Sequence, residues 1–226
     1  MKIKLSFLLG MIISAFLFSN LTAQEEENEN PSKFSAGADF YSSFIWRGSK
    51  LGTGPAFQPN IDFSTGGLTI GVWGSFDAAG YMESDIYASY SFPFGLTLGV
   101  TDYYLPDLDI FDVSDTAGSH GIELTAGFEI KGLSLCANYI INEAGGVGTA
   151  GGDMYFEAGY AFEYVSLFLG AGNGWHTSDG EFAICNVGLG TGKTIKITDS
   201  FSVEVTGQVI FNPERKQLFG VVGFSL

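Results

Sequence analysis

Residues 34–76, FSAGADFYSSFIWRGSKLGTGPAFQPNIDFSTGGLTIGVWGSF, decide the fold. In the last third of this stretch an apolar row alternates with a mostly polar row; the apolar row is Leu68, Ile70, Val72, Gly74 and Phe76. A period of two is the pattern of a β-strand, because successive side chains point to opposite faces of a sheet. The first third alternates in the same way. The stretch therefore predicts strands at 34–47, 56–64 and 67–77, with a long connection at 48–55.

The composition agrees with a protein made of many short strands. The chain has 226 residues, of which 46% are hydrophobic, 15% aromatic and 15% charged, and 32 are glycines. Glycine and aromatic residues at these levels, with few charges, favour strands and turns over helices.

The N-terminus predicts export. Lys2 and Lys4 precede an apolar run from Leu5 to Phe18, and small residues follow it, which is the form of a secretory signal cleaved after Ala23. The run is shorter than the roughly 20 residues that a membrane helix needs. We expect residues 1–23 to be a signal peptide, 24–33 a disordered acidic tail and 34–226 a barrel.

The charge of the mature chain excludes one class of partner. Without the two lysines of the signal, 8 basic and 25 acidic residues give a formal charge of −17. Such a chain repels nucleic acid, so we expect no nucleic-acid partner.

The remaining strands complete a set of twelve. They are predicted at 81–92, 95–105, 119–130, 132–142, 152–164, 165–176, 181–197, 200–212 and 217–226. Tight turns alternate with mostly longer connections, and the strand number is even. These features predict an all-β antiparallel transmembrane β-barrel of about twelve strands, with both termini periplasmic, in the outer membrane of a Gram-negative bacterium. The final strand alternates to the last residue and resembles the signal read by the outer-membrane assembly machinery, which we expect as a partner together with outer-membrane lipid.

Aromatic residues beside the tight turns predict where the barrel meets lipid headgroups. The expected membrane girdle is Phe34, Trp46, Phe63, Phe92, Phe128, Phe162, Phe201 and Phe224. Such girdles flank the apolar band of membrane barrels. The alternative, a soluble sandwich with these rings in its core, is disfavoured because the opposite row is polar on nearly all strands.

The inward row predicts an acidic lumen. The expected pore-lining residues are Asp39, Tyr41, Arg47, Asp62, Trp73, Glu83, Asp85, Tyr87, Glu123, Glu157, Lys196 and Glu204. Carboxylates are not kept in a dry apolar core without partners, so a hydrated lumen that favours cations follows. Arg47 is expected at the rim, opposite Asp39 or a neighbouring carboxylate. The alternative is a plugged barrel whose interior charges form a fixed network.

Several apparent motifs do not support chemistry. The run Gly188 to Thr194 has the wrong spacing for a phosphate loop and no helix after it. Cys136 and Cys185 are predicted to face opposite ways, so a disulfide would require a different register for strand 181–197.

Two further groups are weighed as sites. His120 and His176, with Ser119 or Ser178, could suggest a lipid hydrolase, but no third orienting group is identifiable. The loop at 106–118 brings together Asp107, Asp109, Asp112 and Asp115 but lacks the glycine and the terminal glutamate of an EF-hand calcium loop. We therefore expect no catalytic residue, cofactor or metal, and leave open whether this loop folds inward as a constriction or binds divalent cations.

The opening stretch also resembles a known family. An aromatic residue before Arg47-Gly48, then Pro55 to Gln58 and Asp62, then Gly71 to Ser75, resembles the TorF-like (Gcw_chp) family of Gram-negative outer-membrane porins. The resemblance implies an outer-membrane barrel with a pore and carries over no catalytic residues.

Together these patterns predict an outer-membrane pore for passive diffusion of small polar solutes or cations through an acidic lumen. The alternatives are a non-conducting structural or adhesive barrel and, less favoured, a barrel lipid hydrolase.

Overall fold

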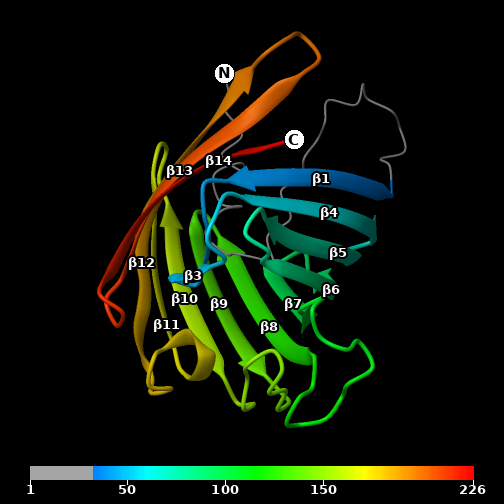
Figure 1. Cartoon of the computed structure of the whole chain (residues 1–226). Coiled ribbons are helices and arrows are strands. Elements are labelled where there is room, and N and C mark those ends of the chain that lie inside the picture. Colours follow the sequence, from blue (N-terminus) through cyan, green and yellow to red (C-terminus); the bar gives the residue numbers. More distant parts are fainter. Residues whose placement is uncertain (1–32) are drawn as a thin grey trace.

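The computed structural model describes residues 33–226, in which twelve strands form one closed antiparallel barrel (Figure 1). The predicted signal peptide and all but the last residue of the predicted tail lie outside the described residues. The barrel strands are β1 (Phe34–Tyr41), β4 (Ala56–Thr65), β5 (Leu68–Asp77), β6 (Met82–Ser91), β7 (Leu96–Tyr104), β8 (His120–Ile130), β9 (Leu133–Ile140), β10 (Met154–Ala161), β11 (Ser166–Gly172), β12 (Ala183–Lys196), β13 (Ser202–Asn212) and β14 (Gln217–Ser225). The predicted all-β, twelve-stranded antiparallel barrel is confirmed.

The barrel closes where the first strand meets the last. Asp39 pairs with Ser225, and Tyr41 pairs with Gly223. Beyond these pairs, the backbone N–H of Leu226 donates to the oxygen of Ala38 at 3.0 Å. The last strand, whose alternation was noted in the sequence, therefore forms the seam that closes the barrel.

The polarity of the two faces of the wall is the reverse of that in a soluble protein. Large apolar side chains are exposed on the outward row, for example Ile61 at 56% and Leu169 at 49%. Polar side chains are buried on the inward row, for example Asp62 at 7% and Glu123 at 0%. Period-two alternation thus places an apolar surface outside and a polar layer inside.

The first predicted strand ends earlier than expected. β1 stops at Tyr41, and the chain turns inward to form a small hairpin of β2 (Phe44–Trp46) and β3 (Ser49–Leu51), here called the inner hairpin. Arg47 (φ 50°) and Gly48 (φ 82°) form its turn. Positive φ at both positions is typical of two-residue hairpin turns, because their twist matches that of the flanking strands. The predicted strand 34–47 therefore merged a wall strand with part of this hairpin.

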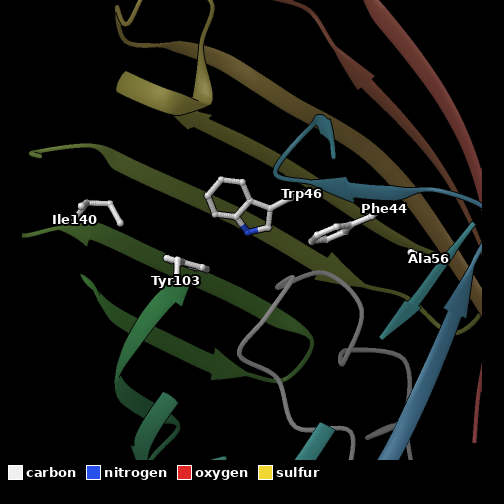
Figure 2. Packing of buried hydrophobic residues seen from close by; sticks show 5 residues of the cluster. All are labelled: Phe44, Trp46, Ala56, Tyr103 and Ile140. Carbon is white, nitrogen blue, oxygen red and sulfur yellow. The ribbon is translucent and has the colours of Figure 1, made fainter. Parts of the chain in front are cut away.

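The inner hairpin lies across the barrel between two walls (Figure 2). On one face, Phe44 and Trp46 belong to a buried cluster with Tyr103 and Ile140. On the other face, Ile45 packs against the cluster of Phe168, Ile210 and Val221, which come from β11, β13 and β14. The hairpin therefore fills part of the interior near the rim that carries the longer connections.

The loop between β7 and β8 does not fold inward. The hydroxyl of Tyr104 donates to the oxygen of Leu108 at 2.9 Å, and a ring nitrogen of His120 lies 2.8 Å from the oxygen of Ile110. Tyr104 and His120 are on the outward row and pair with each other. The loop thus lies against the outer side of the rim, and the connection inside the barrel is the one between β1 and β4.

One register prediction was wrong. The β11–β12 ladder shifts between Gly170 and Ala171, so Cys185 is an extra residue between the paired positions Ile184 and Asn186. Such a bulge turns a side chain to the other face. Cys185 therefore points inward and is fully buried, instead of facing outward as predicted.

Within residues 33–226, no helix is long and apolar enough to cross a membrane.

Candidate functional site

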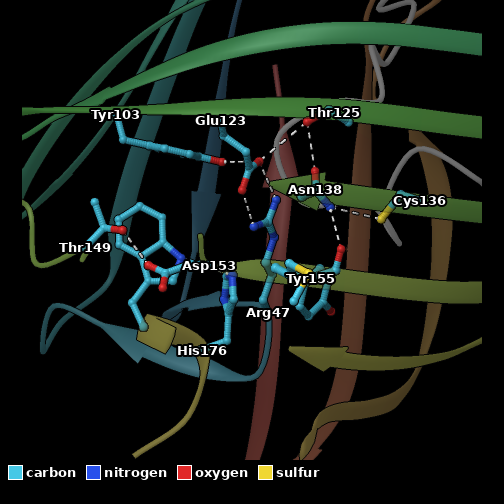
Figure 3. A network of polar contacts seen from close by, with 12 residues as sticks. Arg47, Tyr103, Glu123, Thr125, Cys136, Asn138, Thr149, Asp153, Tyr155 and His176 are labelled. Atoms are coloured by element: carbon cyan, nitrogen blue, oxygen red, sulfur yellow. Dashed lines mark hydrogen bonds and ion pairs between the residues drawn. The ribbon is translucent and has the colours of Figure 1, made fainter. Parts of the chain in front are cut away.

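An ion pair inside the barrel joins the inner hairpin to the wall (Figure 3). Nη1 and Nη2 of Arg47 donate to the two carboxylate oxygens of Glu123 on β8 at 2.6 and 2.7 Å. The side chains are 4% and 1% exposed. The hydroxyl of Tyr103 donates to the same carboxylate at 3.0 Å. Two parallel bonds from one planar cation to one carboxylate fix the orientation of the hairpin turn.

Aromatic rings enclose the Arg47 guanidinium. Its central carbon lies 4.6 Å from the ring centre of Trp46 and 4.7 Å from that of Tyr155. Trp46 in turn meets Trp175 edge-on, with ring centres 5.3 Å apart. Cations over aromatic faces are stabilised most where they are buried, and Arg47 is buried.

His176 supports this cluster as a neutral imidazole. The indole N–H of Trp175 donates to its Nε2 at 3.0 Å, so Nε2 carries no proton. Burial lowers the pKa of His176 well below its ordinary value, and the charge of Arg47 lowers it further. In the 3-10 turn η3 (Gly174–His176), His176 is 1% exposed. A second positive charge beside Arg47 is thereby avoided.

The turn of the inner hairpin fits closely against β12 and β13. The amide of Asn212 donates to the backbone oxygen of Gly48 at 3.0 Å. A Cβ added at Gly48 would overlap the backbone oxygen of Cys185. Only glycine fits at this contact, and it also provides the positive φ that the turn needs.

A second polar group holds the wall behind Arg47. Tyr155 donates to Glu157, and the amide of Asn186 donates to Glu157 at 2.8 Å and to the Tyr155 hydroxyl at 2.9 Å. The Tyr155 hydroxyl is therefore held by wall residues, while its ring also meets His176, with ring centres 5.1 Å apart.

The half of the interior nearer the tight turns is acidic and does not contact the hairpin turn. Asp62 accepts from Asn60 at 2.9 Å and from Tyr87. Asp39 and Glu204 both pair with Ser225, from opposite sides of β14, and both are half-buried. Their carboxylates face the interior from neighbouring positions.

Ten of the predicted lining residues lie on the inward row of the wall. They are Asp39, Tyr41, Asp62, Trp73, Glu83, Asp85, Tyr87, Glu123, Glu157 and Glu204. That they line an open pore stays a prediction.

Two other lining predictions were wrong. Arg47 is not on the wall or at the rim opposite Asp39, because it sits in the inner hairpin and pairs with Glu123. Lys196 lies beyond Gly190, the last residue of β12 that pairs with β11, and it pairs with Asp199 at 2.7 Å. It therefore belongs to the end of the β12–β13 hairpin, which extends past its neighbours (Figure 1).

The predicted girdle is also corrected. Trp46 is 9% exposed inside the barrel and cannot face lipid. Phe201 lies in the β12–β13 turn, four positions beyond Val205, the residue that pairs with Phe224. These two phenylalanines therefore do not share one depth. The outward row does carry the other predicted rings, among them Phe34 and Phe63, whose ring centres are 5.0 Å apart.

The histidines and serines that were weighed as a hydrolase site do not form one. Both ring nitrogens of His120 are occupied, by Asp102 and by the oxygen of Ile110, while the Ser119 hydroxyl donates to the oxygen of Asp109. Ser178 donates to Glu214. In residues 33–226, no group of three His, Cys, Asp or Glu could hold a metal ion.

The two cysteines are free and buried. Although both face inward, β9 and β12 are separated by β10 and β11. Three strand spacings of about 4.8 Å exceed the roughly 7 Å that a disulfide can bridge between Cα atoms.

The comparisons with known proteins place the chain in a family. Residues 25–190 match the family model described as a bacterial protein of unknown function (Gcw_chp). The chain belongs to this family. None of the curated proteins compared with it is significantly similar in sequence.

Among solved structures, the chain is similar to a triple mutant and a double mutant of the Rh. blastica porin. Each match has 16% sequence identity and a TM-score of 0.40, and covers 76% of this chain and 55% of the porin. The chain thus spans about half the length of the porins it matches.

Sequence reasoning missed the inner hairpin and with it Tyr103, Trp175 and His176 as its partners. One signal was present: Arg47-Gly48 stands between two short alternating segments, which is typical of a two-residue hairpin turn.

We expect removal of one partner of the Arg47–Glu123 pair to destabilise the protein strongly. Arg47→Met or Glu123→Leu alone leaves a buried charge without its partner and should lower the free energy of unfolding by about 3–5 kcal/mol. The double variant leaves neither charge, so its loss should be smaller than that of either single variant. Denaturant unfolding followed by tryptophan fluorescence measures this; additive losses would contradict the coupling.

Acid should weaken the docking of the inner hairpin. Because the pKa of His176 is lowered in the folded protein, the His176 contribution is fully present above about pH 6.5, the ordinary value for histidine, and is lost as the pH falls below it. The loss should reach about 1.4 kcal/mol per pH unit. Unfolding curves of wild type and His176→Gln at several pH values test this, and an unchanged slope in the variant would refute the assignment.

Proposed function

We propose that this protein is an outer-membrane β-barrel that passes small polar solutes or cations, and that the inner hairpin closes it. One observation carries the proposal: the outward row of the wall is apolar and exposed, while most of the buried polar and charged side chains of the strands lie on the inward row. A soluble barrel gains nothing from exposed side chains such as Ile61, Val72 and Leu169. In hydrocarbon the same row is favourable, and a closed sheet satisfies its own backbone.

The charges inside support a preference for cations. Carboxylates face the interior from β1, β4, β6, β8, β10 and β13, and Arg47 balances that of Glu123. The remaining negative potential attracts cations and repels anions in a narrow aqueous space. The solutes of this proposal are therefore small and polar or positively charged.

The inner hairpin sets the condition for passage. It contacts both walls near the rim with the longer connections, so passage requires it to shift or leave. This packing favours one alternative, a non-conducting structural barrel in which the hairpin never moves. The proposal also includes export by the signal peptide, insertion by the outer-membrane assembly machinery and lipid around the wall.

Arginine on the outward row tests the membrane part of the proposal. Leu169→Arg, in the middle of β11, should lower the free energy of unfolding by about 2–4 kcal/mol in lipid vesicles, while Leu218→Arg, near the rim, should cost about 0–1 kcal/mol. Both leucines are exposed, so water around the wall would make the two variants alike. Equal, small effects would therefore exclude this exterior as a lipid surface.

Conductance tests the pore. Gly48→Ala introduces a side chain where Cys185 leaves no room, whereas a Cβ at Gly54, in the same connection, meets nothing. In planar bilayers, we expect Gly48→Ala to conduct more than wild type, and Gly54→Ala to match wild type. Heat-modifiable migration on gels checks that each variant is a folded barrel.

Reversal potentials across a salt gradient should show cation preference in Gly48→Ala, reduced by adding Asp39→Asn and Glu204→Gln. Absence of channel steps in both wild type and Gly48→Ala would favour the structural barrel instead.

A further inference from the structure

Three side chains at the Arg47 site come from the wall and not from the inner hairpin. Glu123 and Tyr103 come from β8 and β7, and Tyr155 comes from β10. The Tyr103 hydroxyl is bonded to the carboxylate at 3.0 Å, and Tyr155 is fixed by Asn186 and Glu157. These hydrogen bonds between wall residues do not involve Arg47.

The geometry of this site matches a guanidinium better than an ammonium. Both oxygens of Glu123 accept, one from each terminal nitrogen of Arg47, at 2.6 and 2.7 Å. At the same time the central carbon of the guanidinium lies over the Tyr155 ring, 4.7 Å from its centre. An ammonium is a point charge and cannot form the parallel pair of bonds and stack on a ring together.

The site also needs a cation. The Glu123 side chain is 1% exposed, and a buried carboxylate left without its partner is strongly unfavourable. Movement of the hairpin that leaves Glu123 without a cation is therefore disfavoured. Movement in which another cation takes the place of Arg47 avoids this penalty.

We propose that Glu123, Tyr103 and Tyr155 form a binding site for guanidinium-bearing solutes, which Arg47 occupies in the closed barrel and which such a solute can occupy in its place. Binding itself is independent of the proposed function. The consequence that these solutes release the hairpin and pass preferentially rests on it.

Arg47 competes with any free ligand because it is tethered. Short tethers give effective concentrations on the order of millimolar or above, so wild type should respond only to an excess of free cation. Arg47→Ala removes the competitor and leaves a space between Tyr155 and Trp46 that a small guanidinium can fill.

Chemical rescue of Arg47→Ala is the test. The folded variant in detergent micelles is heated with methylguanidinium chloride or with methylammonium chloride at equal ionic strength. All three tryptophans of the chain, Trp46, Trp73 and Trp175, pack in or against the aromatic cluster around the hairpin, so their fluorescence reports its order. We expect methylguanidinium to raise the unfolding midpoint toward that of wild type in a saturable way, and methylammonium to do so at least about tenfold more weakly.

The matched control is Arg47→Ala combined with Glu123→Gln, which keeps the shape of the site but removes its charge, and it should not respond. Equal responses to the two cations, or an equal response in the double variant, would overturn the proposal. Should Arg47→Ala fail to fold, titration of wild type with argininamide must change the tryptophan emission at high concentration, and no change there overturns the proposal too. Because these readouts need no conduction, rescue without channel activity would refute the proposed function and leave the site standing.

Discussion

Closure of the sheet imposes the constraint from which the rest of the interior follows. With β1 paired to β14, the wall has an inside and an outside, and alternation along each strand sends its apolar row to one and its polar row to the other. Carboxylates such as Glu123 and Glu157 are then buried and bonded to neighbouring side chains, and Glu123 also to the inner hairpin. The inner hairpin meets part of this requirement, because it brings a cation to Glu123 and aromatic rings to the aromatic side chains around it.

The Arg47–Glu123 pair is better understood as a device of specificity than of stability. Desolvation of two buried charges offsets most of their attraction, so such a pair contributes little by itself, while loss of one partner is costly. It therefore favours one position of the hairpin over others nearby. Gly48 acts in the same direction, because its contact with Cys185 admits no side chain.

The sequence was sufficient for the architecture because alternation and turn residues act locally. The twelve strands and the inward row of acids follow from period two, and the order of short and long connections follows from the turn residues. The inner hairpin was missed because Phe44 to Trp46 alternates just as β1 does, and alternation cannot distinguish a wall strand from a segment folded inside the wall. The predicted direction of the Cys185 side chain was wrong for a different reason. A single bulge reverses the faces of a strand, and no residue type at that position indicates a bulge. Trp46 and Arg47 were misplaced together, since both assignments assumed a strand that continued to residue 47.

The span of the contacts made by the inner hairpin determines when it can form. Arg47 and Glu123 are 76 residues apart in the chain, and Gly48 and Asn212 are 164 apart. Contacts over such separations are made late, because the loop entropy must be overcome before they contribute. The inner hairpin comes early in the chain. It can dock only after β8, β12 and β13, which hold its partners, have formed. The inner hairpin therefore depends on the wall: its position is fixed only after strands far along the chain have been made and placed.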